Sequence, residues 1–289
     1  VGRRALDPGV AALEVALAAV AAGVVVGRAR AGVDGADAEV VEPLLVAAAL
    51  DTVDLAASYP WPDATPWIRA MMLLTLDGAV AGADGRSGSL SSATDRAVLA
   101  EVRRLSDVVL IGAGTFRAER YRPILARPQD AAERGRLGLA PAPTLAIVSG
   151  SLDLPWDEPA FRESARRPIV LTTEGAPASA VAFARQHADV ITVHGADLDA
   201  SSVVAHLLDR GLSRIVCEGG PRLLASLSAL GLIDEADITF APVLASGGQV
   251  PTGSAVAHPA RFDLVHAIVD DGFLFTRYVA RQADAGGPA

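Results

Sequence analysis

Short apolar runs rich in β-branched residues recur along the chain from residue 67 onward. They lie at residues 67–75, 107–111, 144–148, 169–172, 190–193 and 214–217. Continuous apolar runs of this length are typical of strands that are buried on both faces of a sheet. The intervening stretches at residues 93–105, 178–187, 201–210 and 221–230 carry apolar residues at helical spacing. This alternation predicts right-handed crossovers and a largely parallel sheet with helices on both sides.

The alternation stops near the C-terminus. The apolar runs at residues 238–244 and 273–279 follow one another without a convincing helix between them. Strands that succeed each other in this way pair in antiparallel fashion. We therefore predict an α/β fold with a mixed, mostly parallel sheet and an antiparallel edge.

The same pattern divides the chain. Residues 1–41 form an Ala-rich N-terminal extension that we expect to be partly helical or disordered, and residues 42–65 form a lead-in segment stiffened by prolines. An apolar stretch at residues 10–27 contains Glu14 and consists mostly of Ala and Val, which disfavours a signal peptide and a membrane-spanning helix. Residues 66–281 are expected to form one domain, and residues 282–289 a disordered tail.

Composition narrows the classes of function. The chain has 289 residues with 25 Lys and Arg against 34 Asp and Glu, a net charge of −9, so it lacks the basic surface of a nucleic-acid-binding protein. A single cysteine, Cys217, permits no internal disulfide, which predicts a reducing, cytoplasmic location. The histidines lie outside HxE and HExxH patterns, and no CxxC is present, so no metal site is expected. The absence of GxSxG and of a P-loop disfavours an α/β-hydrolase and a P-loop ATPase or kinase.

The segment Glu218-Gly219-Gly220-Pro221 carries the most information about function. It places a carboxylate at the end of a buried strand, then two glycines, then a proline at the expected first position of a helix. Such a junction directs free backbone N–H groups and the positive end of a helix dipole at one point, which suits a pyrophosphate. An ordinary tight turn between strand and helix explains the same residues equally well.

A second junction of this type, Gly112-Ala113-Gly114-Thr115, directly follows the strand that ends at Ile111. It lacks the third glycine of a dinucleotide-binding fingerprint, because position 117 is Arg. Ligands of open α/β sheets bind along the carboxyl ends of the strands. The two junctions together therefore indicate a nucleotide site more strongly than either does alone.

The turn after the first strand adds another carboxylate to this edge. Asp77-Gly78 is a common turn-forming pair, and the loop that follows contains Gly82, Gly85 and Gly88, so it can be a lid or a plain surface loop. Ser91 or Ser92 precedes the helical stretch, where capping of the helix is the expected role of the hydroxyl.

In order along the chain, seven segments resemble one family. They are Thr75-Leu76-Asp77-Gly78, Gly88-Ser89-Leu90-Ser91, Asp107 through Thr115, Glu218-Gly219-Gly220-Pro221, Asp234-Glu235, Ala241-Pro242-Val243-Leu244 with Gly247-Gly248, and Leu274-Phe275-Thr276-Arg277-Tyr278. The family is the reductase domain at the C-terminus of the bifunctional riboflavin-biosynthesis deaminase/reductase. The stand-alone pyrimidine reductases of high-GC bacteria are the most similar members, and the resemblance covers roughly residues 66 to 281.

The resemblance implies a dihydrofolate-reductase-like, three-layer α/β/α fold, NADPH as cofactor, a small-molecule substrate and a homodimer, with no nucleic-acid or membrane partner. It implies reduction of a ribosylaminopyrimidine 5′-phosphate to the ribitylamino compound, in which donor and acceptor must be aligned. Asp77 and Glu218 become the candidate catalytic residues. The candidate NADPH-binding residues are Gly112, Gly114, Thr115, Ser149, Thr172, Gly219, Gly220, Arg222 and Leu223, and the candidate substrate-binding residues are Ser91, Arg117, Glu119 and Tyr121.

Two positions depart from the family pattern. Ala79 stands where many bifunctional members have a basic residue, and Met71 where relatives often have Asn. The deaminase half is absent from the sequence. Two alternatives therefore stay open, namely a dihydrofolate- or pteridine-reducing enzyme of the same fold and a non-catalytic nucleotide-binding protein.

Overall fold

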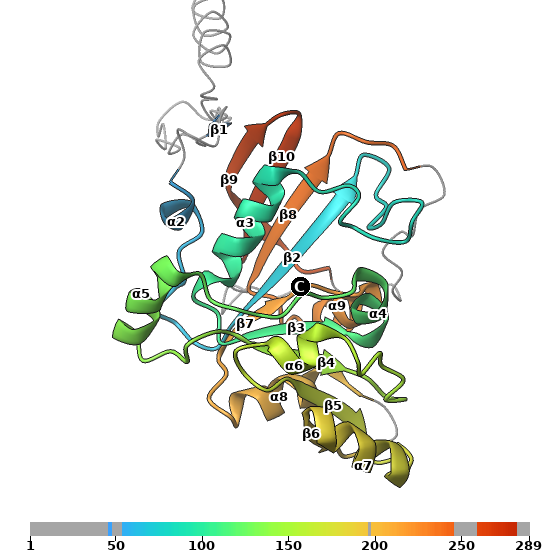
Figure 1. Ribbon diagram of the computed structural model, residues 1–289. Coiled ribbons are helices and arrows are strands. Elements are labelled where there is room, and N and C mark those ends of the chain that lie inside the picture. Colours follow the sequence, from blue (N-terminus) through green and yellow to red (C-terminus); the bar gives the residue numbers. More distant parts are fainter. Residues whose placement is uncertain (1–45, 48–53, 196–197, 246–258, 282–289) are drawn as a thin grey trace, which may run out of the picture.

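One ten-stranded sheet organises the part of the chain that the computed structural model describes, namely residues 46–47, 54–195, 198–245 and 259–281 (Figure 1). The strands are β1 (Val46–Ala47), β2 (Trp67–Thr75), β3 (Val108–Gly112), β4 (Thr144–Val148), β5 (Ile169–Thr173), β6 (Asp189–Val193), β7 (Arg214–Cys217), β8 (Glu235–Ala241), β9 (Phe262–Asp270) and β10 (Phe273–Ala280). The helices are α2 (Leu55–Ser58), α3 (Ala93–Arg104), α4 (Ala113–Glu119), the 3-10 helix η2 (Pro128–Asp130), α5 (Ala131–Arg136), α6 (Pro159–Glu163), α7 (Ala178–His187), α8 (Ala200–Leu208) and α9 (Pro221–Ala229). The expected extension at residues 1–41, the tail at 282–289 and the pair Gly247-Gly248 lie outside the described residues.

Parallel pairing dominates the sheet, as the sequence predicts. The strand order is β1-β9-β10-β8-β2-β7-β3-β4-β5-β6. Every pairing from β8 to β6 in this order is parallel, whereas β10 is antiparallel to both β8 and β9. The predicted mixed sheet with an antiparallel part is therefore confirmed, although the short β1 adds a parallel pairing beyond β9.

Several elements differ from the prediction. The last parallel strand begins at Glu235 and not at residue 238, because its first half contains the buried charged residues Glu235 and Asp237. β9 escapes prediction because its burial does not alternate, and the register of its pairing with β10 shifts between Arg277 and Tyr278. The helices α2, α4, α5 and α6 have only four to seven residues, too few to establish a periodic pattern.

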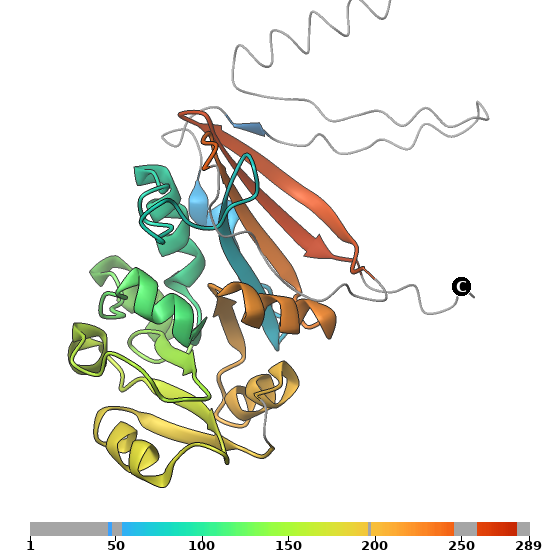
Figure 2. The ribbon, with the colours of Figure 1, turned by 90° about the vertical axis from the view of Figure 1, so that its right-hand side faces the viewer.

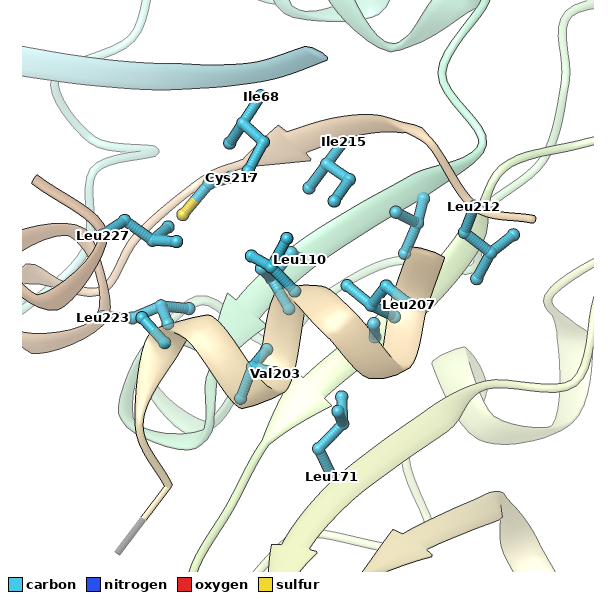
Figure 3. Close-up of a cluster of buried hydrophobic side chains, with 14 of the residues drawn as sticks. Ile68, Leu110, Leu171, Val203, Leu207, Leu212, Ile215, Cys217, Leu223 and Leu227 are labelled. Carbon is cyan, nitrogen blue, oxygen red and sulfur yellow. The ribbon is translucent and has the colours of Figure 1, made fainter. Parts of the chain in front are cut away.

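Helices cover both faces of the parallel half of the sheet (Figure 2). On one face, α8 and α9 pack against the strands through a buried cluster that includes Val203, Leu207, Leu223 and Leu227 (Figure 3). The opposite face is covered by α3, α4, α6 and α7, whose buried contacts include Val98, Val102, Phe116, Phe161 and Ala184. This arrangement is the predicted three-layer α/β/α architecture.

The inner strands are apolar on both faces, which explains their continuous apolar runs. In β3, Leu110 belongs to the cluster under α8 and α9, whereas Ile111 belongs to the cluster on the opposite face, and both are fully buried. Burying one such side chain contributes about 1.5–3 kcal/mol. Strands β3 and β7 are thereby held rigidly at the centre of the sheet, where both glycine-rich junctions begin.

A buried charged cluster joins the parallel and antiparallel parts of the sheet. Glu235 is fully buried and lies 3.0 Å from Arg69 Nε, while it accepts hydrogen bonds from Arg277 Nε at 2.8 Å and Trp67 Nε1 at 3.0 Å. The Arg69 guanidinium also donates to the carbonyl of Tyr59 at 3.3 Å. Removing one member of a buried pair leaves an uncompensated charge and costs about 3–5 kcal/mol. This cluster therefore fixes β2, β8 and β10 in register.

Two further buried groups of this region are held neutral. Burial, together with the charge of Glu235, raises the pKa of Asp237 well above its usual range. Because Glu235 already faces two arginines, the proton resides on Asp237. Burial and the positive charge of Arg277 lower the pKa of His266 to about 4. Folding therefore takes up a proton at Asp237 near neutral pH and excludes one from His266 between about pH 4 and pH 6.5.

The substitution Asp237→Asn tests the protonated state of Asp237. The unfolded carboxyl group loses its proton near pH 3.8 while the folded one keeps it, so this residue makes folding less favourable as the pH rises above about 4. An amide imitates the protonated acid without that penalty. We expect the free energy of unfolding of the variant, measured in urea, to exceed that of the parent increasingly from pH 5 to pH 8, by up to about 1.4 kcal/mol per pH unit. Asp63→Asn, at an exposed position, is the control, and an equal difference at both pH values would contradict the assignment.

Candidate active site

A large cavity opens along the carboxyl ends of β2, β3, β4 and β7, between α3, α4 and α9. Its volume is about 1620 Å³. Pockets for a single small molecule usually measure about 300–1,000 Å³, so this cavity has room for two ligands side by side. We refer to it as the central cavity.

The two glycine-rich junctions meet in the wall of the central cavity. The N–H of Gly112 donates to the carbonyl of Gly219 at 2.8 Å, and a Cβ at Gly220 would lie 2.6 Å from Thr115 Oγ1. Gly219 has φ +82°, and the peptide between Gly219 and Gly220 is cis. Only a residue without a side chain fits at position 220. The two glycine-rich junctions, which the sequence places at one edge of the sheet, are therefore in direct contact.

Helix α9 begins at this contact. Gly220 is its N-cap and Pro221 its first residue, and no side chain caps this end. The first-turn N–H groups and the positive end of the helix dipole therefore remain available to a ligand. Arg222 is exposed at the same helix end and lines the central cavity. This end of the cavity can hold a phosphate.

Glu218 is held by two neighbouring side chains, and we call the three residues the Glu218 cluster. Its side chain is 6% exposed and accepts hydrogen bonds from Arg103 Nε and Nη2, each at 2.5 Å, and from the Tyr121 hydroxyl at 2.8 Å. Burial opposes the charge of Arg103, but the carboxylate of Glu218 outweighs it and raises the pKa of Arg103. Burial, with the charge of Glu218, also raises the pKa of Tyr121 well above its usual value. The cluster is thus a preorganised polar group whose hydroxyl keeps its proton.

The lining of the central cavity is positively charged within an acidic protein. Its arginines outnumber its carboxylates, with Arg96, Arg103, Arg117, Arg120, Arg122 and Arg222 against Asp95, Glu119 and Glu218. The whole chain has a net charge of −9. Clefts lined by one sign of charge attract ligands of the opposite sign. The cavity is therefore suited to anionic ligands such as phosphate esters.

Sequence reasoning missed the contribution of α3. Asp95, Leu99 and Arg103 recur every four residues on one face of this helix, with Arg96 and Ala100 beside them, and all five line the central cavity. The sequence signal for this contribution is a row of residues on one face of the helix, with the polar residues Asp95 and Arg103 at its two ends. Such a stripe is difficult to separate from an ordinary solvated face without knowing what the helix packs against.

The structure brings most of the predicted site residues together. Those that line the central cavity are Glu218, Gly112, Gly114, Thr115, Ser149, Gly220, Arg222, Leu223, Ser91, Arg117, Glu119 and Tyr121. The remaining three are Asp77, Thr172 and Gly219, which are not part of the lining. Thr172 is fully buried beneath it and donates to the carbonyl of Gly150 at 3.4 Å, and Gly219 contributes its backbone to the junction.

Asp77 occupies the exposed turn after β2. Its Oδ1 accepts hydrogen bonds from Thr75 Oγ1 at 2.5 Å and from Ala245 N at 3.0 Å. These contacts hold the end of β2 against the segment that follows β8. The catalytic role expected for Asp77 stays a prediction.

Several of the lining residues hold the walls in place. Glu119 accepts a hydrogen bond from Ser87 N at 2.6 Å, which fixes the loop between β2 and α3 against α4. Arg117 Nη1 donates to the Asp153 carbonyl at 2.6 Å, and Ser149 Oγ accepts from Leu152 N at 3.1 Å. These contacts order the loop after β4 beside the cavity.

The described residues contain neither a cluster of metal ligands nor a helix suited to a membrane. Across the described residues, no three histidine, cysteine, aspartate or glutamate side chains gather into a possible metal site. Within the same ranges, none of the helices has the length and apolar character that crossing a bilayer requires.

Two reductases of known name are similar to this chain in sequence. The chain is 24% identical over 214 residues to the 2,5-diamino-6-ribosylamino-4(3H)-pyrimidinone 5′-phosphate reductase of Archaeoglobus fulgidus, covering 73% of this chain and 97% of that relative. It is 30% identical over 189 residues to the protein of the same name from Methanothermobacter thermautotrophicus, covering 65% and 82%.

Two solved structures show the same fold. A pyrimidine reductase-like protein from Corynebacterium diphtheriae superposes with a TM-score of 0.63 at 22% identity, covering 81% of this chain and 97% of the other. A diaminohydroxyphosphoribosylaminopyrimidine deaminase/5-amino-6-(5-phosphoribosylamino)uracil reductase from Thermotoga maritima gives a TM-score of 0.58 at 21% identity, covering 75% and 57%. The sequence profile of the RibD C-terminal domain matches residues 66–270. The chain therefore belongs to the RibD C-terminal domain family.

Proposed function

We propose that this protein is an NADPH-dependent reductase that converts a ribosylaminopyrimidine 5′-phosphate to its ribitylamino product. One observation carries the proposal: the two glycine junctions, the open end of α9 and the excess of arginine all face a single cavity of about 1620 Å³. The archaeal relatives named as reductases of such a compound support it, since the alignment covers nearly the whole of one of them.

The fit of the backbone supports the choice of a dinucleotide cofactor. Gly112, Gly114 and Thr115 on one side and Gly220 and Arg222 on the other would hold its pyrophosphate, with Leu223 beside them. The loop that begins at Ser149 would accept the adenosine half. When bound, NADPH supplies the hydride that adds to C1′ of the opened sugar, while a proton goes to the adjacent nitrogen.

The Glu218 cluster, whose carboxylate residue directly precedes the Gly219-Gly220 turn, also supports the proposed chemistry. Because Arg103 and Tyr121 hold Glu218 in place, its carboxylate can accept hydrogen bonds from a ligand without reorganising. Alignment of the donor with the acceptor is the main contribution expected of such a site, with a value of about 7–11 kcal/mol for well-oriented partners.

We further propose that the protein forms a homodimer through the open face of its antiparallel strands. Leu264, Val265 and Val269 of β9 are each at least 37% exposed. No described helix lies on the outer side of β9 and β10 (Figure 2). Apolar side chains on an uncovered sheet face are typical of an interface between subunits.

The variant Gly220→Ala tests the cofactor site. An added Cβ would lie 2.6 Å from Thr115 Oγ1 and displace the junction, so the dissociation constant for NADPH, followed by nicotinamide fluorescence, should rise by at least about tenfold. The matched control is Gly135→Ala, because a Cβ there meets nothing within 4 Å and the residue is exposed in α5. A folded Gly220→Ala protein with unchanged affinity would remove this junction from the cofactor site.

Glu218→Gln tests the role of the Glu218 cluster. Loss of the charge should lower kcat by about 100-fold with NADPH affinity within about threefold, measured as NADPH oxidation at saturating substrate. Glu133→Gln removes a carboxylate that pairs with Arg104 outside the cavity and should leave kcat unchanged. Asp77→Asn is measured alongside, and an unaltered kcat in that variant would show that Asp77 is structural. Equal loss of turnover and NADPH binding in Glu218→Gln would contradict a role in the reaction.

Val269→Asp tests the proposed homodimer. A charge placed on the open sheet face should convert the dimer to a monomer, as measured by light scattering after size-exclusion chromatography. Asp263→Asn, on the same strand, removes a charge and should leave the dimer intact. A parent protein that is monomeric throughout a concentration series would refute this interface.

A further inference from the structure

Asp95 of α3 is a buried carboxylate that lacks one of its hydrogen-bond partners. Its side chain lines the central cavity, and the residue is 6% exposed. Oδ2 accepts a hydrogen bond from the Ser91 hydroxyl at 2.6 Å, but Oδ1 is buried and accepts none from the described residues. A buried acceptor without a donor loses its hydration without compensation, and the cost is larger when the group is charged. The cavity therefore contains an acceptor that a ligand can satisfy.

Neighbouring cations do not neutralise Asp95. Arg96, the next residue, directs Nη1 to the Ser91 carbonyl at 3.3 Å, and no described Arg, Lys or His forms an ion pair with Asp95. This contrasts with Glu218, whose two oxygens both accept hydrogen bonds, from Arg103 and from Tyr121. Of these two carboxylates in the cavity wall, Asp95 is the one with an oxygen that accepts no hydrogen bond from the described residues.

The surroundings of Asp95 suit the face of a flat ring. Leu99 lies one turn further along the same face of α3, and Met71 and Leu73 of β2 pack in the same apolar cluster. All three also line the central cavity. A planar heterocycle that rests on this apolar wall would present its edge to Asp95. Met71, which departs from the family pattern, contributes part of this wall.

We propose that Asp95 binds the edge of a 2-aminopyrimidin-4-one ring, accepting hydrogen bonds from the 2-amino group and the adjacent ring N3–H. This inference rests on the proposed function and names the class of substrate. The two oxygens of a carboxylate can accept hydrogen bonds from two parallel N–H groups at once, and such bidentate pairs are strong. A slight turn about the last torsion of Asp95, which is soft for this residue type, brings Oδ1 to the ligand while Ser91 retains Oδ2.

The same contact discriminates against the deaminated ring. A uracil-type ring carries a carbonyl at position 2, so an acceptor would face the acceptor oxygen of Asp95, and one hydrogen bond would be replaced by repulsion. Sites built to hydrogen-bond a substrate N–H or O–H reject analogues that lack it by up to about 10⁴–10⁵-fold. Recognition by Asp95 therefore implies that the protein reduces the ring that still carries its 2-amino group. A reaction that removes this group would have to act on the product.

The test compares three substrates by NADPH oxidation. They are 2,5-diamino-6-ribosylamino-4(3H)-pyrimidinone 5′-phosphate, its 2-oxo counterpart 5-amino-6-(5-phosphoribosylamino)uracil, and dihydrofolate, which carries the same 2-amino-4-oxo edge without the ribosyl phosphate. We expect kcat/KM for the 2-amino phosphate to exceed that for the 2-oxo phosphate by at least about 100-fold. Turnover of dihydrofolate as well would identify a pterin as a second source of the same edge, and lack of it would restrict the site to the ribosyl phosphate.

The variant Asp95→Asn separates recognition from a structural role. Its amide can donate to a 2-oxo group, so the preference between the two phosphates should shrink by at least about tenfold or reverse, mainly through KM. A purely structural role would lower kcat/KM for both substrates equally. Glu101→Gln is the matched control, because Glu101 lies on the same helix and pairs with Arg104 and Arg127 away from the central cavity. That variant should keep the parental preference.

The outcomes distinguish this inference from the proposed function. Equal turnover of the two phosphates, preference for the 2-oxo compound, or an unchanged preference in Asp95→Asn would refute the role of Asp95 while the reductase activity stands. Failure of the parent protein to reduce either phosphate would refute the proposed function. Calorimetric binding of the two phosphates to parent and variant would then decide the role of Asp95, since a preference for the 2-amino ring that Asp95→Asn abolishes supports it and equal binding overturns it.

Discussion

The site depends on the direct contact between two strand ends. Strands β3 and β7 are neighbours in the sheet, and each continues into a glycine-rich turn. The hydrogen bond from Gly112 to Gly219 holds these turns together, and the lack of a side chain at Gly220 leaves room for Thr115. Helices α4 and α9 both start at this point, so their positions follow from the pairing of the two strands. The buried apolar residues of β3 and β7 keep that pairing rigid.

Charge is distributed unevenly between the buried interior and the lining of the central cavity. Outside the cavity, buried Arg69 is paired with Glu235, and buried Asp237 is neutral because its pKa is raised. The cavity lining instead contains exposed arginines such as Arg120, Arg122 and Arg222. An acidic protein thereby offers phosphate-bearing ligands one cationic region. The buried charged cluster lies where β2, β8 and β10 meet, whereas the cationic lining of the cavity follows the carboxyl ends of the central parallel strands.

Much of this organisation could be predicted from the sequence, because buried parallel strands have an unmistakable apolar signature. β2, β4 and β7 have the predicted bounds, and Gly220 and Pro221 begin α9 as expected. The elements that were predicted wrongly share a cause, because the local polarity of the sequence does not show which of their residues tertiary packing buries. Glu235 and Asp237 are interior residues that look like surface residues, and the bulged β9 has no regular period.

The site was predicted less completely, for a related reason. Residues that follow strands can be assigned to one edge of the sheet from the topology alone, and most of those candidates line the cavity. Asp95 and Arg103 come from a helix that crosses above that edge, and their orientation depends on how α3 packs on β2. Sequence spacing places them on one face but does not say what the face meets.

Helix α3 also sets a length within the central cavity. Asp95 and Arg103 are eight residues apart on the same face, which corresponds to about 12 Å along the axis. The helix is fixed at its start by the bond from Thr94 to Asp270 and near its end by the pairing of Arg103 with Glu218. In the proposed complex, this fixed spacing would set the distance between the ring edge at Asp95 and the reacting carbon of the substrate. A shorter or longer molecule would then be misaligned with the hydride donor.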